Sequence, residues 1–238
     1  MKKTKHRKNV QAPVKINKEG KEFYLTRYKV TDSLIKTNEN KFSKLAQEQL
    51  DDTFDLITTD PMQAIEKLLV LKEAYPQAPV LYNHLSVAYA RMGNTNAVRE
   101  LVIENFDKNP DYLFAKINYA QLCLDKGEFE KIPVIFDNKF DLKLLYPKRN
   151  TFHVTEFAGL TGVLCAYYCC IGKRDTAQLL FDSLKKVTPE SNMVKYAKSF
   201  LSPSWITKLL RLVHKKQEQA LKLKAQENKA ENNFNFKA

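Results

Sequence analysis

Apolar residues recur at intervals of three and four along the central part of the chain, which is the spacing of one face of an α-helix. The segment 81–89 shows this pattern, a glycine follows, and a second segment of the same kind covers 98–106. Glycine can adopt the positive φ that ends a helix, and Asn94 or Thr95 can cap the helix after Gly93. The pattern predicts a helical hairpin with these apolar positions: Leu81, Tyr82, Leu85, Ala88, Tyr89, Val98, Leu101, Val102 and Phe106.

Similar hairpins are predicted around Gly127 and Gly172. Gly93 and Gly127 are 34 residues apart, and so are Pro76 and Pro110. A shared period in two kinds of residue that interrupt helices indicates an internal repeat. An earlier unit is predicted as well, because Asp60-Pro61 is a typical helix start that follows a first helix over 41–58.

The repeated unit resembles that of the tetratricopeptide-repeat family. In the first unit the matching residues are Tyr82, Leu85, Ser86, Tyr89, Gly93, Val98, Val102 and Pro110, and in the third they are Leu164, Cys165, Tyr168, Gly172, Ala177, Phe181 and Pro189. The second unit matches less well. The resemblance implies an all-α fold in which antiparallel helical hairpins stack as a right-handed α-solenoid.

The pattern divides the chain into three parts. Residues 41–201 form the TPR-like helical repeat array, which includes a helix predicted over 190–201. Residues 1–40 form a basic N-terminal extension, partly disordered or with a short hairpin over 14–30. Residues 202–238 form a basic capping helix, which begins at Ser202-Pro203, and a tail.

One irregularity interrupts the period. Gly127 and Gly172 are 45 residues apart, and the surplus falls at 139–150. We weigh two interpretations equally. The insertion is functional, as insertions on one face of an array often are, or it is an extended second helix and a loop that packs Leu142, Leu144 and Leu145 on the array.

The net charge says little about the function of the repeat array itself, because it belongs to the two ends of the chain. The net charge is +12, but residues 1–50 carry +8, residues 201–238 carry +5, and the segment between them carries −1. Basic ends attract phosphate or anionic lipid without specificity, so an RNA- or ribosome-associated protein is the alternative function. No stretch resembles a signal peptide or a membrane-spanning helix. Three of the four cysteines lie within six residues of an apolar segment, which is no disulfide framework, so we expect a cytoplasmic protein.

The sequence contains no catalytic motif, and we expect no enzyme activity, no metal and no cofactor. Cys165, Cys169 and Cys170 lie close together, but no histidine or second cysteine cluster accompanies them, so core packing is the favoured interpretation. The basic amphipathic segment 205–216 has the profile of a partner-docking helix, and a cap on the last repeat is its simpler interpretation.

The resemblance implies a concave groove that is lined by the first helix of each unit and binds a peptide or helix of another protein. The chain is therefore predicted to be a non-catalytic scaffold or adaptor. One subfamily binds the carboxylate end of chaperone tails through a clamp of Lys, Asn and Arg side chains. Among the positions that correspond to this clamp, only Asn118 holds a matching residue, so we expect the clamp to be absent. The predicted partner-binding residues are Asn83, Val87, Ala90 and Arg91, then Ile117, Gln121 and Leu124, then Gly162, Ala166 and Cys169.

Overall fold

A computed structural model describes residues 28–33, 35 and 42–202 of the chain. This part is mostly helical, with ten α-helices, one 3-10 turn and two short strands. In chain order the elements are β1 (Lys29–Thr31), α1 (Lys44–Thr59), α2 (Pro61–Ala74), α3 (Pro79–Arg91), α4 (Thr95–Lys108), α5 (Leu113–Asp125), η1 (Phe129–Lys131), α6 (Ile132–Ile135), α7 (Leu142–Leu145), β2 (Thr151–His153), α8 (Val154–Cys170), α9 (Arg174–Val187) and α10 (Asn192–Leu201).

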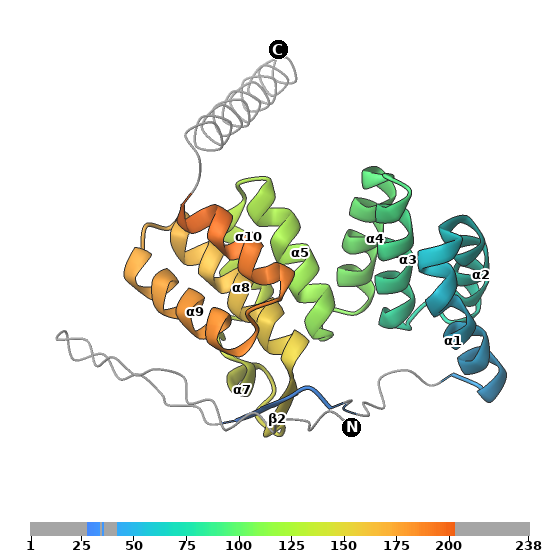
Figure 1. Cartoon of the computed structure of the whole chain (residues 1–238), viewed down its shortest axis with the longest axis horizontal. Helices are drawn as coiled ribbons and strands as arrows, with labels where there is room; N and C mark the ends of the chain where they lie inside the picture. Colours follow the sequence, from blue (N-terminus) through green and yellow to red (C-terminus); the bar gives the residue numbers. More distant parts are fainter. Residues whose placement is uncertain (1–27, 34, 36–41, 203–238) are drawn as a thin grey trace, which may run out of the picture.

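Neighbouring helices pack against one another along the whole row. Each of α1 to α4 contacts the next helix in the chain, α5 contacts α8, and α8 contacts α9. Helix α10 packs on both α8 and α9. Figure 1 shows the result, a row of helices that runs from α1 and α2 at one end to α8, α9 and α10 at the other. The predicted all-α class and the packing of adjacent helices are confirmed.

The helix ends follow the local signals in the sequence. Asp60 caps α2, because its side chain accepts a hydrogen bond from the Gln63 amide, and Asn94 caps α4 in the same way. Gly93, Gly127 and Gly172 have φ of +73°, +80° and +78°. Residues with a side chain rarely adopt this left-handed conformation, so the three turns depend on glycine.

The apolar core is divided between the two ends of the row. One cluster joins α1 to α4 and includes Leu68 and Tyr82, and a second joins α5 to α10 and includes Phe136 and Phe152.

A network of polar side chains lies between these two clusters. The Asn83 amide nitrogen donates to the Tyr112 hydroxyl at 3.2 Å, and its oxygen accepts from Asn105 at 3.5 Å and from Asn118 at 3.4 Å.

The irregular segment differs from the extended helix that was one of the two interpretations. After Gly127 the chain forms η1 and the single turn α6, and then Asp137 and Asn138 both adopt positive φ. Two successive left-handed residues cannot continue an α-helix, so the extended helix of that interpretation is wrong, although Leu145 of its loop packs against the second core cluster. Leu142 is buried, as the packing of the loop requires, whereas Leu144 is 42% exposed.

The insertion is held by charged side chains. Lys143 Nζ donates to the carbonyl oxygens of Pro147 and Arg149 at 2.7 and 3.0 Å. Both terminal nitrogens of Arg149 lie 2.8 Å from the carboxylate of Glu156, a residue 6% exposed in the first turn of α8. Bidentate pairs of this kind fix the relative orientation of the two side chains, so the insertion is anchored to α8 in a defined conformation.

The N-terminal extension contacts this insertion. Strand β1 pairs in parallel with β2, with Lys29 opposite Thr151 and Thr31 opposite His153. The ring of Tyr28 meets Phe152 edge-on, and Val30 is buried in the second core cluster. The predicted hairpin over 14–30 and the C-terminal capping helix over 202–238 lie outside the described residues, apart from residues 28–30 and Ser202. Within the described residues, no helix is both long and apolar enough to cross a membrane.

Candidate functional site

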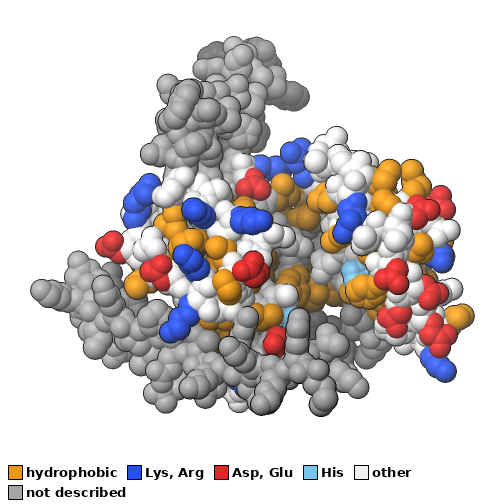
Figure 2. Space-filling model, in the orientation of Figure 1, with side chains coloured by type: hydrophobic (Ala, Val, Ile, Leu, Met, Phe, Trp, Pro, Cys, Tyr) orange, Lys and Arg blue, Asp and Glu red, His pale blue; other side chains and the backbone are white. Residues whose placement is uncertain are grey.

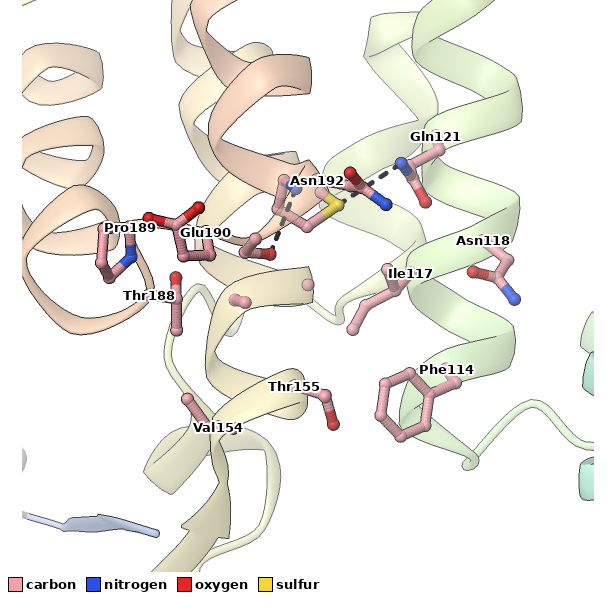
Figure 3. A pocket seen from close by; sticks show the side chains of 14 residues that line it. Phe114, Ile117, Asn118, Gln121, Val154, Thr155, Thr188, Pro189, Glu190 and Asn192 are labelled. Atoms are coloured by element: carbon pink, nitrogen blue, oxygen red, sulfur yellow. Dashed lines mark hydrogen bonds between the residues drawn. The ribbon is translucent and has the colours of Figure 1, made fainter. Parts of the chain in front are cut away.

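A pocket of about 480 Å³ opens between α5, α8 and the turn that leads into α10. Phe114 and Ile117 project from α5 toward α8 (Figure 3). Helix α8 contributes its first turns, and the far wall is the α9–α10 turn. The remaining lining residues are Asn118, Gln121, Val154, Thr155, Ala158, Gly159, Thr188, Pro189, Glu190, Ser191, Asn192 and Met193.

The close approach of α5 and α8 at the base of the pocket depends on Gly159. A Cβ at this position would lie 2.8 Å from Ile117 Cδ1. That separation is well below van der Waals contact, so the glycine brings the two helices together under the pocket.

One wall is closed by α10. A Cβ at Gly162 would lie 2.6 Å from Met193 Cε, and Ala166 next to it is fully buried. We predicted that Gly162, Ala166 and Cys169 would offer a small apolar surface to a partner. The chain's own α10 covers this face of α8, because small residues allow a neighbouring helix to come close.

The rim of the pocket is polar. The Gln121 amide nitrogen lies 3.7 Å from Met193 Sδ, and the Ser191 hydroxyl accepts a hydrogen bond from the Met193 amide. Glu190 and Asn192 are exposed beside them. The rim can therefore orient a ligand through amide and hydroxyl groups, and its one carboxylate, Glu190, favours a cation.

The predicted residues of α3 do not line this pocket. Asn83 is part of the polar network between the two core clusters, and Val87, Ala90 and Arg91 are exposed on α3. From α5, Ile117 and Gln121 do line the pocket, but Leu124 is 3% exposed and belongs to the core. A partner could not reach Leu124 or Ala166 in this structure. The sequence pattern also missed Phe114 and the segment 188–193, whose position depends on how α10 packs.

Two buried thiols are held in the protonated form. A hydrogen bond with Cys169, together with burial, raises the pKa of the Cys165 thiol far above its ordinary range. Burial raises the pKa of Cys123 to about 11. Protonated thiols are poor nucleophiles and poor metal ligands. In the part of the chain that the structure describes, no three His, Cys, Asp or Glu residues are grouped so that they could hold a metal ion.

Comparisons with protein-family models, with curated proteins and with solved structures found no match to this chain.

Proposed function

We propose that the chain is a non-catalytic scaffold of the tetratricopeptide type, a right-handed α-solenoid whose pocket between α5, α8 and α10 binds a peptide or helix of another protein. The observation that carries this proposal is the pocket itself. It is largely apolar, it has a polar rim, and it lies where three helices meet. The positive-φ glycines at 93 and 127, one 34-residue period apart, support the repeat assignment.

The pocket favours one kind of ligand. Its volume of about 480 Å³ suits one or two large apolar side chains between Phe114, Ile117 and Met193. Burial of one such side chain contributes about 1.5–3 kcal/mol, which is weak alone. The rim must therefore contribute, and the exposed carboxylate of Glu190 favours a basic residue next to the apolar anchor.

The test is site-specific cross-linking in the native lysate. A photoreactive phenylalanine analogue replaces Thr155 or Asn192, both exposed at the pocket, and replaces Val134 on α6 as the matched control. Val134 is 77% exposed and lies outside the pocket. We expect protein adducts from positions 155 and 192, and none of the same mass from position 134.

A competing variant makes the result specific. Ser191→Trp should fill the pocket from its rim and abolish the adduct formed at position 155, while Val134→Trp should leave it unchanged. Equal adducts from all three positions would contradict the proposal. If the adducts instead disappear after nuclease treatment, the RNA-associated function that the basic ends suggest would replace it.

A further inference from the structure

The opposite end of the helical row carries a second surface that the pocket does not involve. Phe54 of α1 is 57% exposed, and its ring meets the ring of His84 on α3 edge-on, with centroids 4.7 Å apart. Val87 lies one turn after His84 on α3 and is 48% exposed. Large apolar groups from two packed helices therefore face solvent side by side.

Carboxylates lie along the α1 side of this apolar surface, and on the α3 side the exposed Arg91 follows Val87 by one turn. Helix α1 carries three exposed carboxylates, which belong to Glu48, Asp51 and Asp55. Because they are spaced three and four residues apart, they share one face of the helix. The sixteen residues of α1 include four carboxylates and one lysine. Figure 2 shows acidic side chains gathered over this end of the molecule. We call Glu48, Asp51, Phe54, Asp55 and Val87 the acidic face.

A ligand that complements this face needs an apolar stripe flanked by cations. The chain itself contains such a segment. Residues 205–216 hold four Lys or Arg residues and no carboxylate, and their apolar residues recur at helical spacing. This segment lies outside the described residues and follows α10 after three residues.

The segment begins at the end of the row that lies opposite its own acidic face. Helix α10 ends at Leu201 and packs on α8 and α9, whereas α1 lies at the other end of the row (Figure 1). Pairing of two acidic faces is unfavourable, because it would bring like charges together.

We propose that residues 205–216 of a second copy bind the acidic face as an amphipathic helix, so that copies of the chain associate head to tail. Such an interface joins two different surfaces, and it leaves a free acidic face at one end and a free basic segment at the other. Association therefore continues beyond the dimer as concentration rises. This inference concerns a different surface from the proposed pocket and does not depend on it.

Two neutralising variants of the full-length chain test the proposal. Asp51→Asn with Asp55→Asn removes charge from the acidic face and keeps the basic segment. Lys208→Gln with Arg211→Gln removes charge from the segment and keeps the face. Asp107→Asn with Asp111→Asn, two exposed carboxylates elsewhere, is the matched control. Circular dichroism and thermal melts establish that each variant is folded.

Sedimentation equilibrium gives the decisive result. We expect the wild type and the control to form larger species with rising concentration, and each neutralised variant to associate at least tenfold more weakly. Mixing the two neutralised variants should restore one intact interface and yield a heterodimer of twice the 27.6 kDa chain mass that grows no further. Raising the salt concentration from about 0.1 M to about 1 M shortens the screening length from about 10 Å to about 3 Å, and should weaken the wild-type association.

Three outcomes would overturn the proposal. A monomeric wild type at low salt would mean that no second copy binds. Dimers that persist after neutralisation of the basic segment would indicate pairing of two acidic faces or another interface. An equal loss in the control variant would indicate a general charge effect.

Discussion

Replacement of Gly159 by alanine tests whether the contact between α5 and α8 beneath the pocket is as close as the structure places it. Alanine in the interior of a helix is favoured over glycine by about 1 kcal/mol. Against this, the new Cβ would lie 2.8 Å from Ile117 Cδ1, and overpacking of a tight core typically costs about 1–3 kcal/mol. We therefore expect Gly159→Ala to be neutral or to lower the free energy of unfolding by up to about 2 kcal/mol.

The double-mutant cycle with Ile117→Val isolates the contact. The valine lacks Cδ1, and the nearest remaining Ile117 atom is 3.4 Å away. In that background Gly159→Ala should stabilise the protein by about 1 kcal/mol. The coupling between the two sites is then about 1–3 kcal/mol, well above the roughly 0.3–0.5 kcal/mol within which independent sites add.

Urea unfolding followed by circular dichroism at 222 nm measures the free energy of unfolding of the wild type, of each single variant and of the double variant. Ile117→Val alone should cost about 0.5–1.5 kcal/mol, as for a buried Ile that loses one methyl group. Additive effects of the two substitutions would refute the reasoning, because they would mean that α5 and α8 do not meet through these atoms.

Three further predictions concern other parts of the fold. Gly172→Ala should lower the free energy of unfolding by about 1–2 kcal/mol, as measured by urea titration, because φ is +78° and nothing lies near the new Cβ to offset the strain. Arg149→Met should cost about 3 kcal/mol, because it leaves the carboxylate of Glu156 buried without its partner, and the double variant with Glu156→Gln should recover part of this loss. Burial lowers the pKa of His84 in the folded chain below its ordinary value of 6.5. Between this lowered pKa and 6.5 the unfolded chain binds more protons than the folded chain, so the free energy of unfolding falls as the pH drops below about 6.5. The melting temperature should therefore decline less between pH 7.5 and pH 5.5 in His84→Leu than in the wild type, and an equal decline would contradict this origin.

The elements that sequence reasoning predicted are those with strong local signals. Asp60-Pro61 and Gly93-Asn94 define helix ends through caps and backbone conformation that involve only nearby residues. The departure after Gly127 was harder to predict. Asp137 and Asn138 adopt positive φ, and neither residue type requires it.

The predicted lining of the groove was less accurate, because it depended on the rotation of each helix and on what packs against it. Ile117 and Gln121 line the pocket, but Leu124, one turn further along α5, is turned into the core. Ala166 is fully buried, and one turn before it Gly162 meets Met193 of α10, a residue 31 positions away in the sequence. Periodicity identifies the apolar face of a helix, but it does not identify which neighbour occupies that face.

The pairing of β1 with β2 has a consequence for the synthesis of the chain. Most contacts in a row of packed helices are local and can form as each helix leaves the ribosome. The register of Lys29 opposite Thr151 instead closes a loop of 122 residues. At about 5–20 residues per second, β1 waits roughly 6–24 seconds for its partner strand. During that interval the backbone groups of Lys29–Thr31 have no partner strand, so this edge stays unpaired while the chain that forms α1 to α7 is synthesised.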